Sequence, residues 1–124
     1  MRVTGLDHIV LNCADVERSL DWYSGTLGLA GERVEEWRRG EVPFPSVRVD
    51  ATTIIDLFDS PRSGENLNHF CLVLAPRDWE DMVAAGTVPV ERGPSRVFGA
   101  RGMGTSVYTS DPDGNTVELR RYDE

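Results

Sequence analysis

The sequence predicts an α+β fold in which one βαβββ module is repeated within a single domain. A short segment around His8 recurs around His69, half a chain later. A strand-like run carrying one carboxylate ends each half, at Asp56 and at Glu118. Histidine and carboxylate are 48 residues apart in the first half and 49 in the second. Such a constant internal spacing indicates a duplicated structural unit.

The length of 124 residues fits one compact domain built from both copies. We expect the first module to cover residues 1–59 and the second to cover 66–124. The polar residues 60–65, which include proline and glycine, form the expected linker.

In the first module, residues 6–12 form a β-rich run and Asp15 is the expected N-cap of a helix. The apolar residues of this helix recur at helical spacing, and Gly25 and Gly28 are expected to end it. The apolar residues at this spacing are Val16, Leu20, Tyr23 and Leu27. Three further strands are expected at 34–37, 45–49 and 53–58.

The second module follows the same order. Residues 67–74 form a strand, and a helix carries Trp79, Met82 and Val83 on one face before it ends at Gly86. Strands are expected at 88–92, 105–110 and 116–121, with residues 93–104 as a glycine-rich loop. The dense turn signal over residues 111–115 separates the last two strands.

The charge balance excludes some partners. Thirteen basic and 21 acidic residues give a formal net charge of −8, which repels nucleic acid. No apolar run approaches the length of a membrane span. No charged-then-apolar leader is visible at the start, so we expect a cytoplasmic protein. Its two cysteines, Cys13 and Cys71, are expected to be reduced.

Strand alternation decides which side chains share a face. His8 points with Leu6 and Val10, whereas Asp7 points to the other side. If the two modules pack about a pseudo-twofold axis, His8, His69 and Glu118 converge. Two imidazoles and a carboxylate suit a divalent transition metal, and this donor set does not distinguish among Zn, Ni, Mn and Fe.

The competing interpretation is that each histidine is an ordinary core residue. The recurrence of both histidines at equivalent positions, each with a partner carboxylate, favours metal ligation, because a metal relieves the cost of a buried Glu118. The role of Asp56 stays open at this point. It is a fourth ligand, a group next to the ligands or a general base.

These features resemble the vicinal oxygen chelate superfamily, which includes glyoxalase I, methylmalonyl-CoA epimerase, extradiol dioxygenases and the fosfomycin- and bleomycin-resistance proteins. The resemblance covers essentially the whole chain. It rests on five marks: Leu6-Asp7-His8, Ser19-Leu20-Asp21-Trp22-Tyr23, Leu27-Gly28, His69, and Asp111-Pro112-Asp113-Gly114-Asn115 leading to Glu118.

The resemblance implies a curved, partly open β-barrel-like sheet with flanking helices, and often a homodimer. It implies a metal held by His8, His69 and Glu118, with a fourth ligand from around Asp56 in some members. The shared chemistry is chelation of neighbouring substrate oxygens, where the metal stabilises a developing oxyanion. Asp56 is the candidate for moving a proton.

Candidate substrate-binding residues are Arg101, Tyr108 and Cys71. Arg101, or alternatively Arg96, belongs to the glycine-rich segment and suits a substrate anion. Tyr108 matches a position that contacts substrate oxygens in the fosfomycin-resistance relatives, and Cys71 shares a face with His69. Two other features have structural interpretations: a salt bridge for Arg48, and core or dimer packing for Trp22 and Tyr23.

The leading functional prediction is a glyoxalase-like, metal-dependent isomerase, epimerase or lyase acting on a small oxygen-rich metabolite. A non-haem Fe(II) ring-cleavage dioxygenase is the first alternative, since two histidines and one carboxylate also suit iron. A bleomycin-resistance-like binding protein without catalysis is the second. The retained ligand set argues against that last class.

Overall fold

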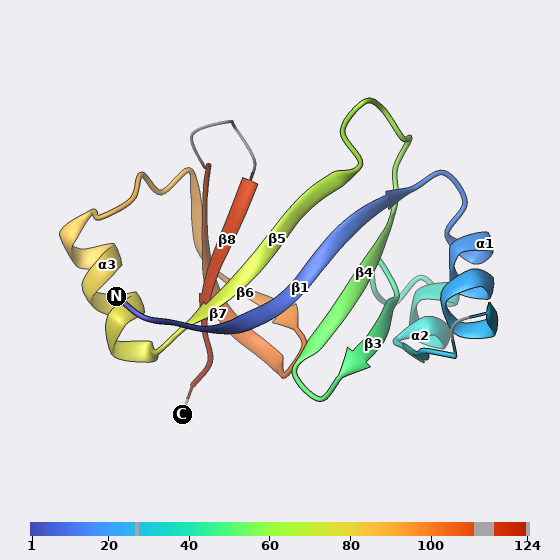
Figure 1. Cartoon of the computed structure of the whole chain (residues 1–124), viewed down its shortest axis with the longest axis horizontal. Helices are drawn as coiled ribbons and strands as arrows, with labels where there is room; N and C mark the ends of the chain where they lie inside the picture. Colours follow the sequence, from blue (N-terminus) through green and yellow to red (C-terminus); the bar gives the residue numbers. More distant parts are fainter. Residues whose placement is uncertain (27, 111–115, 124) are drawn as a thin grey trace. The chain divides into compact units, whose positions relative to one another are not determined.

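The computed structural model describes residues 1–26, 28–110 and 116–123, and the chain divides into two compact units (Figure 1). Unit 1 comprises Met1–His8 and His69–Glu124, and unit 2 comprises Ile9–Asn68. Strand β1 (Val3–Cys13) therefore contributes its first residues to unit 1 and its last residues to unit 2. The two histidines and Glu118 all belong to unit 1.

Unit 2 continues with helix α1 (Val16–Leu20), the π-helix η1 (Asp21–Thr26), strand β2 (Ala30–Glu32) and helix α2 (Val34–Arg38). Strands β3 (Ser46–Asp50) and β4 (Thr53–Asp59) complete it, and β2, β3 and β4 pair in antiparallel order. Asp15 caps α1 as predicted, because its side chain accepts a hydrogen bond from the Arg18 N–H. The helices pack on a small apolar cluster of Cys13, Val16, Leu20, Val47 and Leu57.

Unit 1 is built from strand β5 (Leu67–Leu74), helix α3 (Pro76–Ala85), and strands β6 (Arg92–Gly99), β7 (Gly102–Ser110) and β8 (Thr116–Arg121). β5 lies parallel to β8, β8 is antiparallel to β7, and β7 is antiparallel to β6. Helix α3 begins with Pro76 and ends at Gly86, whose φ of 64° suits a glycine cap.

The two faces of this sheet differ in chemistry. One face packs against α3, where the Trp79 indole N–H donates to the carbonyl of Leu119 at 2.9 Å. Its apolar cluster consists of Leu74, Trp79, Met82, Val107, Val117 and Leu119. Because side chains alternate along a strand, Glu118 and Arg120 point to the opposite face. That second face carries the candidate site.

Three sequence expectations are wrong. Residues 34–37 form helix α2 instead of a strand, since Val34 and Trp37 use a three-residue spacing to reach the same apolar cluster. A strand was expected at 88–92, but residues 88–91 belong to no strand and β6 starts at Arg92. The glycine-rich segment 93–104 is mostly the β6–β7 hairpin and not a loop.

The remaining elements agree with the sequence, including both β-rich runs around the histidines and the strands at 105–110 and 116–121. The α+β class and the βαβββ order of each half are confirmed, with α2 as an addition to the first. Leu27 and the turn 111–115 lie outside the described residues. None of the helices in the described ranges has the length and apolar character that crossing a membrane requires.

Candidate metal centre

Three side chains of unit 1 converge on a common point. Nε2 of His8 and Nε2 of His69 each lie 3.1 Å from Oε1 of Glu118. The three ligand atoms lie within 4.8 Å of one another, and all three side chains are buried. The imidazole rings of His8 and His69 meet edge to face, with their centroids 5.6 Å apart. The convergence expected from the repeat is therefore present in the structure.

Strand pairing explains how residues so far apart in sequence meet. Cys71 of β5 lies directly opposite Glu118 of the parallel strand β8. His69 is two residues before Cys71, so it projects from the same face of the sheet. His8 comes from β1 of the same unit. Each donor sits on a strand, where the backbone hydrogen-bond ladder restricts its position.

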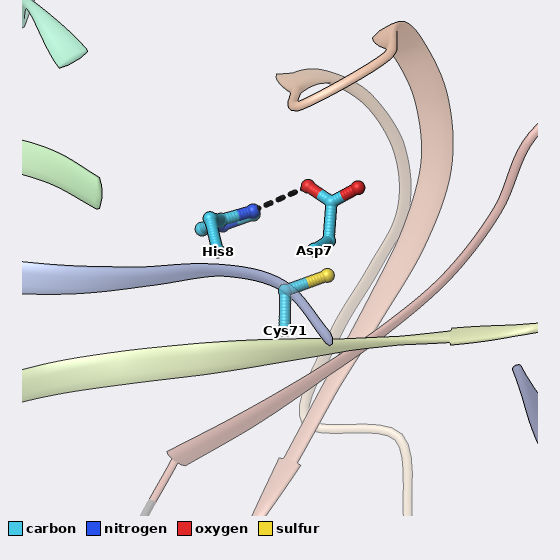
Figure 2. A group of neighbouring side chains, drawn as sticks. All are labelled: Asp7, His8 and Cys71. Atoms are coloured by element: carbon cyan, nitrogen blue, oxygen red, sulfur yellow. Dashed lines mark hydrogen bonds and ion pairs between the residues drawn. The ribbon is translucent and has the colours of Figure 1, made fainter. Parts of the chain in front are cut away.

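The second ring nitrogen of His8 has its own partner. Nδ1 of His8 lies 2.7 Å from Oδ2 of Asp7, as Figure 2 shows, and both side chains are buried. A carboxylate accepts hydrogen bonds, so Nδ1 carries a proton, and in the neutral form of the ring this leaves the lone pair on Nε2. That lone pair faces the anionic Oε1 of Glu118.

The donor atoms and their spacing decide whether a metal ion fits between these three side chains. Each of the three facing atoms can present a lone pair, and all three lie within 4.8 Å of one another. A divalent cation satisfies all three donors at once. Two imidazole nitrogens and one carboxylate oxygen also belong to the donor types that Zn, Mn, Fe and Ni accept. The donor set therefore fits a transition metal.

Asp7 is held ionised by its surroundings. The Tyr122 hydroxyl donates to Oδ1, and the backbone N–H of Ala100 donates to Oδ2 at 3.0 Å. Burial raises the pKa of Asp7, but the hydrogen bonds from His8 and Tyr122 outweigh it and place the pKa below its ordinary value. Asp7 is thus a buried anion whose strongest contact is a candidate metal ligand.

The two carboxylate oxygens of Glu118 have different partners. Oε1 faces the histidines, whereas Oε2 accepts from the Ser106 hydroxyl at 2.8 Å and from Nη2 of Arg120 at 3.0 Å. Burial raises the pKa of Glu118, but the histidines and Arg120 outweigh it and hold the pKa well below its usual range. The carboxylate is therefore ionised and fixed in orientation.

Arg120 links the two carboxylates. Its guanidinium is fully buried, bonds to Glu118 and donates to the carbonyls of Val97 and Phe98. Nη1 lies 3.8 Å from Oδ2 of Asp7. The cation reaches this position because Gly99 has no side chain, since a Cβ there would overlap Nη1. A buried charge with this many partners rigidifies its surroundings.

Sequence reasoning assigned no site role to Asp7, Ser106, Arg120 or Tyr122. Alternation along β8 places Arg120 and Tyr122 on the face of Glu118, so this signal was present in the sequence. Asp7 gave no such signal. Alternation placed it on the face away from His8, yet its carboxylate bonds to the His8 ring.

The other predicted site residues have clear positions. Asp56 lies in unit 2 on β4, where it is buried and accepts from the Ser46 hydroxyl. The ring of Tyr108 meets that of His69 at a centroid distance of 5.6 Å. Burial and the Glu118 carboxylate raise the pKa of Tyr108.

Cys71 is fully buried beside Asp7 and His8 (Figure 2), and burial followed by Glu118 raises its thiol pKa. Arg101 is exposed in the β6–β7 turn, with its guanidinium 4.2 Å from the centroid of the Tyr122 ring.

Arg96, the alternative substrate-binding residue, and the residues given structural roles have these contacts. Arg96 pairs with Asp123 at 2.9 Å, and the predicted salt bridge of Arg48 is confirmed with Glu32. Tyr23 packs against the unit 2 cluster, whereas Trp22 is 51% exposed.

Comparisons with known proteins show the family and the fold of the chain. The chain is 27% identical to the glyoxalase domain-containing protein RDO1 of Mycosarcoma maydis, over 100% of this chain and 72% of that protein. Its fold is similar to that of the Mn(II)-bound glyoxalase from Novosphingobium aromaticivorans, with a TM-score of 0.71 and 19% identity over 96% of this chain and 38% of the other.

A second solved structure, a variant of the Streptomyces coelicolor methylmalonyl-CoA epimerase in complex with 2-nitronate-propionyl-CoA, gives a TM-score of 0.65. It is 20% identical and covers 99% of this chain and 100% of that chain. At such identities these structures show a shared fold. Residues 5–119 also match a family as a whole. The chain belongs to the Glyoxalase/Bleomycin resistance protein/Dioxygenase superfamily.

Proposed function

We propose that this protein is a metal-dependent enzyme of the glyoxalase type, performing isomerase, epimerase or lyase chemistry on a small oxygen-rich metabolite. The observation that carries the proposal is the convergence of His8, His69 and Glu118 on one point. Two structural neighbours, a Mn(II)-bound glyoxalase and a methylmalonyl-CoA epimerase, support this reaction class.

His8, His69 and Glu118 would hold the divalent ion. When bound, the ion supplies a Lewis acid that polarises neighbouring oxygens of the substrate. Asp7 orients His8, while Ser106 and Arg120 orient Glu118. Preorganised ligands of this kind avoid rearrangement during the reaction.

We assign the proton-transfer role to Asp56. It is the repeat equivalent of Glu118, and its shorter side chain suits a base better than a tight ligand. Tyr108, Arg101 and Cys71 are the proposed substrate contacts, with Tyr108 the best supported because its ring touches that of His69. We also propose a cytoplasmic homodimer.

Activity assays on protein loaded with Mn(II), Zn(II), Ni(II) or Fe(II) test the proposal. We expect turnover of a hemithioacetal or epimerisation of an acidic carbon centre without oxygen uptake, and loss of that turnover in His69→Ala. Asp56→Asn should lower kcat and leave metal content unchanged. An enzyme assay that gives no turnover with any of these metals, across a panel of such substrates, contradicts the enzymatic proposal and favours a binding protein.

The second candidate is an Fe(II) dioxygenase. Its support is the donor set itself, because two histidines and one carboxylate leave ligand positions open on iron. Oxygen consumption with a catechol, dependent on Fe(II) and on Glu118, would select this candidate over the first. No oxygen uptake with Fe(II)-loaded protein would exclude it.

A further inference from the structure

A row of four residues crosses the polar face of unit 1. Cys71 of β5 lies opposite Glu118 of β8, Glu118 lies opposite Tyr108 of β7, and Tyr108 lies opposite Arg92 of β6. Residues directly opposite each other in paired strands project from the same face. Arg92 therefore faces the same side of the sheet as the candidate metal ligands.

Tyr108 connects Arg92 to that centre. The guanidinium carbon of Arg92 lies 4.0 Å from the centroid of the Tyr108 ring. The Tyr108 ring in turn meets the ring of His69. Stacking on an aromatic face fixes the planar fork of an arginine while leaving its N–H groups available for an anion.

Exposure rises along the same row. Cys71 and Glu118 are buried, Tyr108 is partly buried, and Arg92 is exposed. Arg92 is therefore the exposed end of a row of side chains that leads to the buried ligands. Within the described residues the only partner of this guanidinium is the Tyr108 ring, and no carboxylate lies within ion-pair distance.

The other arginines of this region are placed differently. Arg120 is buried on the Glu118 carboxylate, and Arg96 pairs with Asp123. Arg101 lies in the β6–β7 turn, outside the row, over the ring of Tyr122. Arg96 also lies opposite Thr105, which alternates with Ser106 and so faces the other side of β7. Arg92 is thus the arginine placed to meet a ligand at the candidate centre.

The local charge also favours an anion. Among the described buried groups of unit 1, the two carboxylates of Asp7 and Glu118 face one guanidinium, that of Arg120. A divalent ion at the centre reverses this net negative charge to a net positive one. Arg92 adds a further positive charge beside it, although the whole chain carries −8. Such a local field concentrates small anions.

We propose that Arg92 is the specificity-determining residue for a carboxylate of the substrate. The substrate class is a small hydroxy or oxo acid whose neighbouring oxygens face the metal ligands and whose second carboxylate reaches Arg92. This inference rests on the proposed metal-dependent function. Tyr108 serves as the platform on which the guanidinium is held, and the arginine fork binds the carboxylate through charge-assisted hydrogen bonds.

Paired probes that differ only in the second carboxylate test the inference. The Mn(II)-loaded protein is titrated with malate against 2-hydroxybutyrate, and with 2-hydroxyglutarate against 2-hydroxypentanoate, after its Mn(II) affinity has been measured alone. In wild type we expect at least one dicarboxylate to bind about tenfold tighter than its methyl-ended partner. Arg92→Gln should remove that preference and leave the Kd for Mn(II) and for the methyl-ended acids unchanged.

The matched control is Arg96→Gln, which removes the same charge from the same strand and should keep the preference. Arg92→Lys should retain part of it, because a charge remains without the fork. A wild type that binds Mn(II) but shows no preference overturns this inference alone. A preference that survives in Arg92→Gln, or that is lost equally in Arg96→Gln, also overturns it. A wild type without Mn(II) affinity overturns the proposed function, and the inference with it.

Discussion

Oδ2 of Asp7 lies 2.7 Å from Nδ1 of His8, although the two residues are neighbours in one strand. Adjacent side chains of a strand ordinarily point to opposite faces. Here the Ala100 N–H and the Tyr122 hydroxyl hold the Asp7 carboxylate beside the ring. The β6–β7 turn and the end of the chain therefore help to fix a candidate ligand on β1.

Substituting Asp7 by Asn tests this relationship. The amide keeps the size of the side chain but loses the charge that favours the Nδ1–H form of His8. We expect metal affinity to fall about 10- to 100-fold, the usual effect of removing a ligand's hydrogen-bonded partner. Competition with a chelator of known affinity gives the Kd, and ¹⁵N NMR of the His8 ring reports its tautomer.

Asp78→Asn is the control, because Asp78 lies on α3 of the same unit and, among the described residues, accepts a single hydrogen bond, at the surface, from the Arg2 backbone. Its metal affinity should equal that of wild type. A folded Asp7→Asn protein with unchanged metal affinity and an unchanged His8 tautomer would refute the orienting role.

Gly99 is predicted to be intolerant of any side chain. An added Cβ overlaps the Arg120 guanidinium and comes within 2.5 Å of Oδ2 of Asp7. Both groups are buried and held by hydrogen bonds that a shift would break, so Gly99→Ala should lower the free energy of unfolding by about 2 kcal/mol or more. Urea unfolding followed by circular dichroism measures the loss.

Gly5→Ala is the matched control, since nothing lies within 4 Å of a Cβ at that position of β1. Its stability should stay within about 0.5 kcal/mol of wild type. Equal stability of the two variants would mean that Arg120 does not occupy the space beside Gly99.

Ser106 tests the support of Glu118. Its buried hydroxyl donates to Oε2 of Glu118 and accepts from Nε of Arg120. Removing it in Ser106→Ala leaves two buried charged groups each with one bond fewer, so we expect a loss of about 1–3 kcal/mol in unfolding free energy. Ser110 is exposed on the same strand as Ser106 and donates to Glu91, so Ser110→Ala should cost far less. Similar losses for the two serines would contradict the network.

The sequence predicted the parts of the fold that repeat. The runs around His8 and His69 and the last strand of each half carry alternating apolar residues, which is the signal of a half-buried strand. Helix α2 was missed because Val34 and Trp37 were assigned to a strand, although their three-residue spacing fits a helix. Strand β6 was misplaced because Gly93, Pro94 and Gly99 are typical of a loop, and only the pairing with β7 fixes them in a strand.

The candidate ligands could be predicted because a repeat makes their equivalence visible. The residues that orient them could not, because their partners are distant in sequence and unrelated by the repeat. Asp7 and Tyr122 are separated by 115 residues. The room for Arg120 depends on Gly99, whose role appears only when β6 and β8 are both in place. Long-range contacts of this kind leave no local pattern.

Metal content tests the central claim most directly. The protein, purified without chelators and dialysed against Mn(II) or Zn(II), is analysed by inductively coupled plasma mass spectrometry beside His8→Ala, His69→Ala and Glu118→Ala, with folding checked by circular dichroism. We predict about one ion per chain in wild type and a large loss in each folded variant. A metal-free wild type, or an ion retained equally by all three variants, would contradict the account.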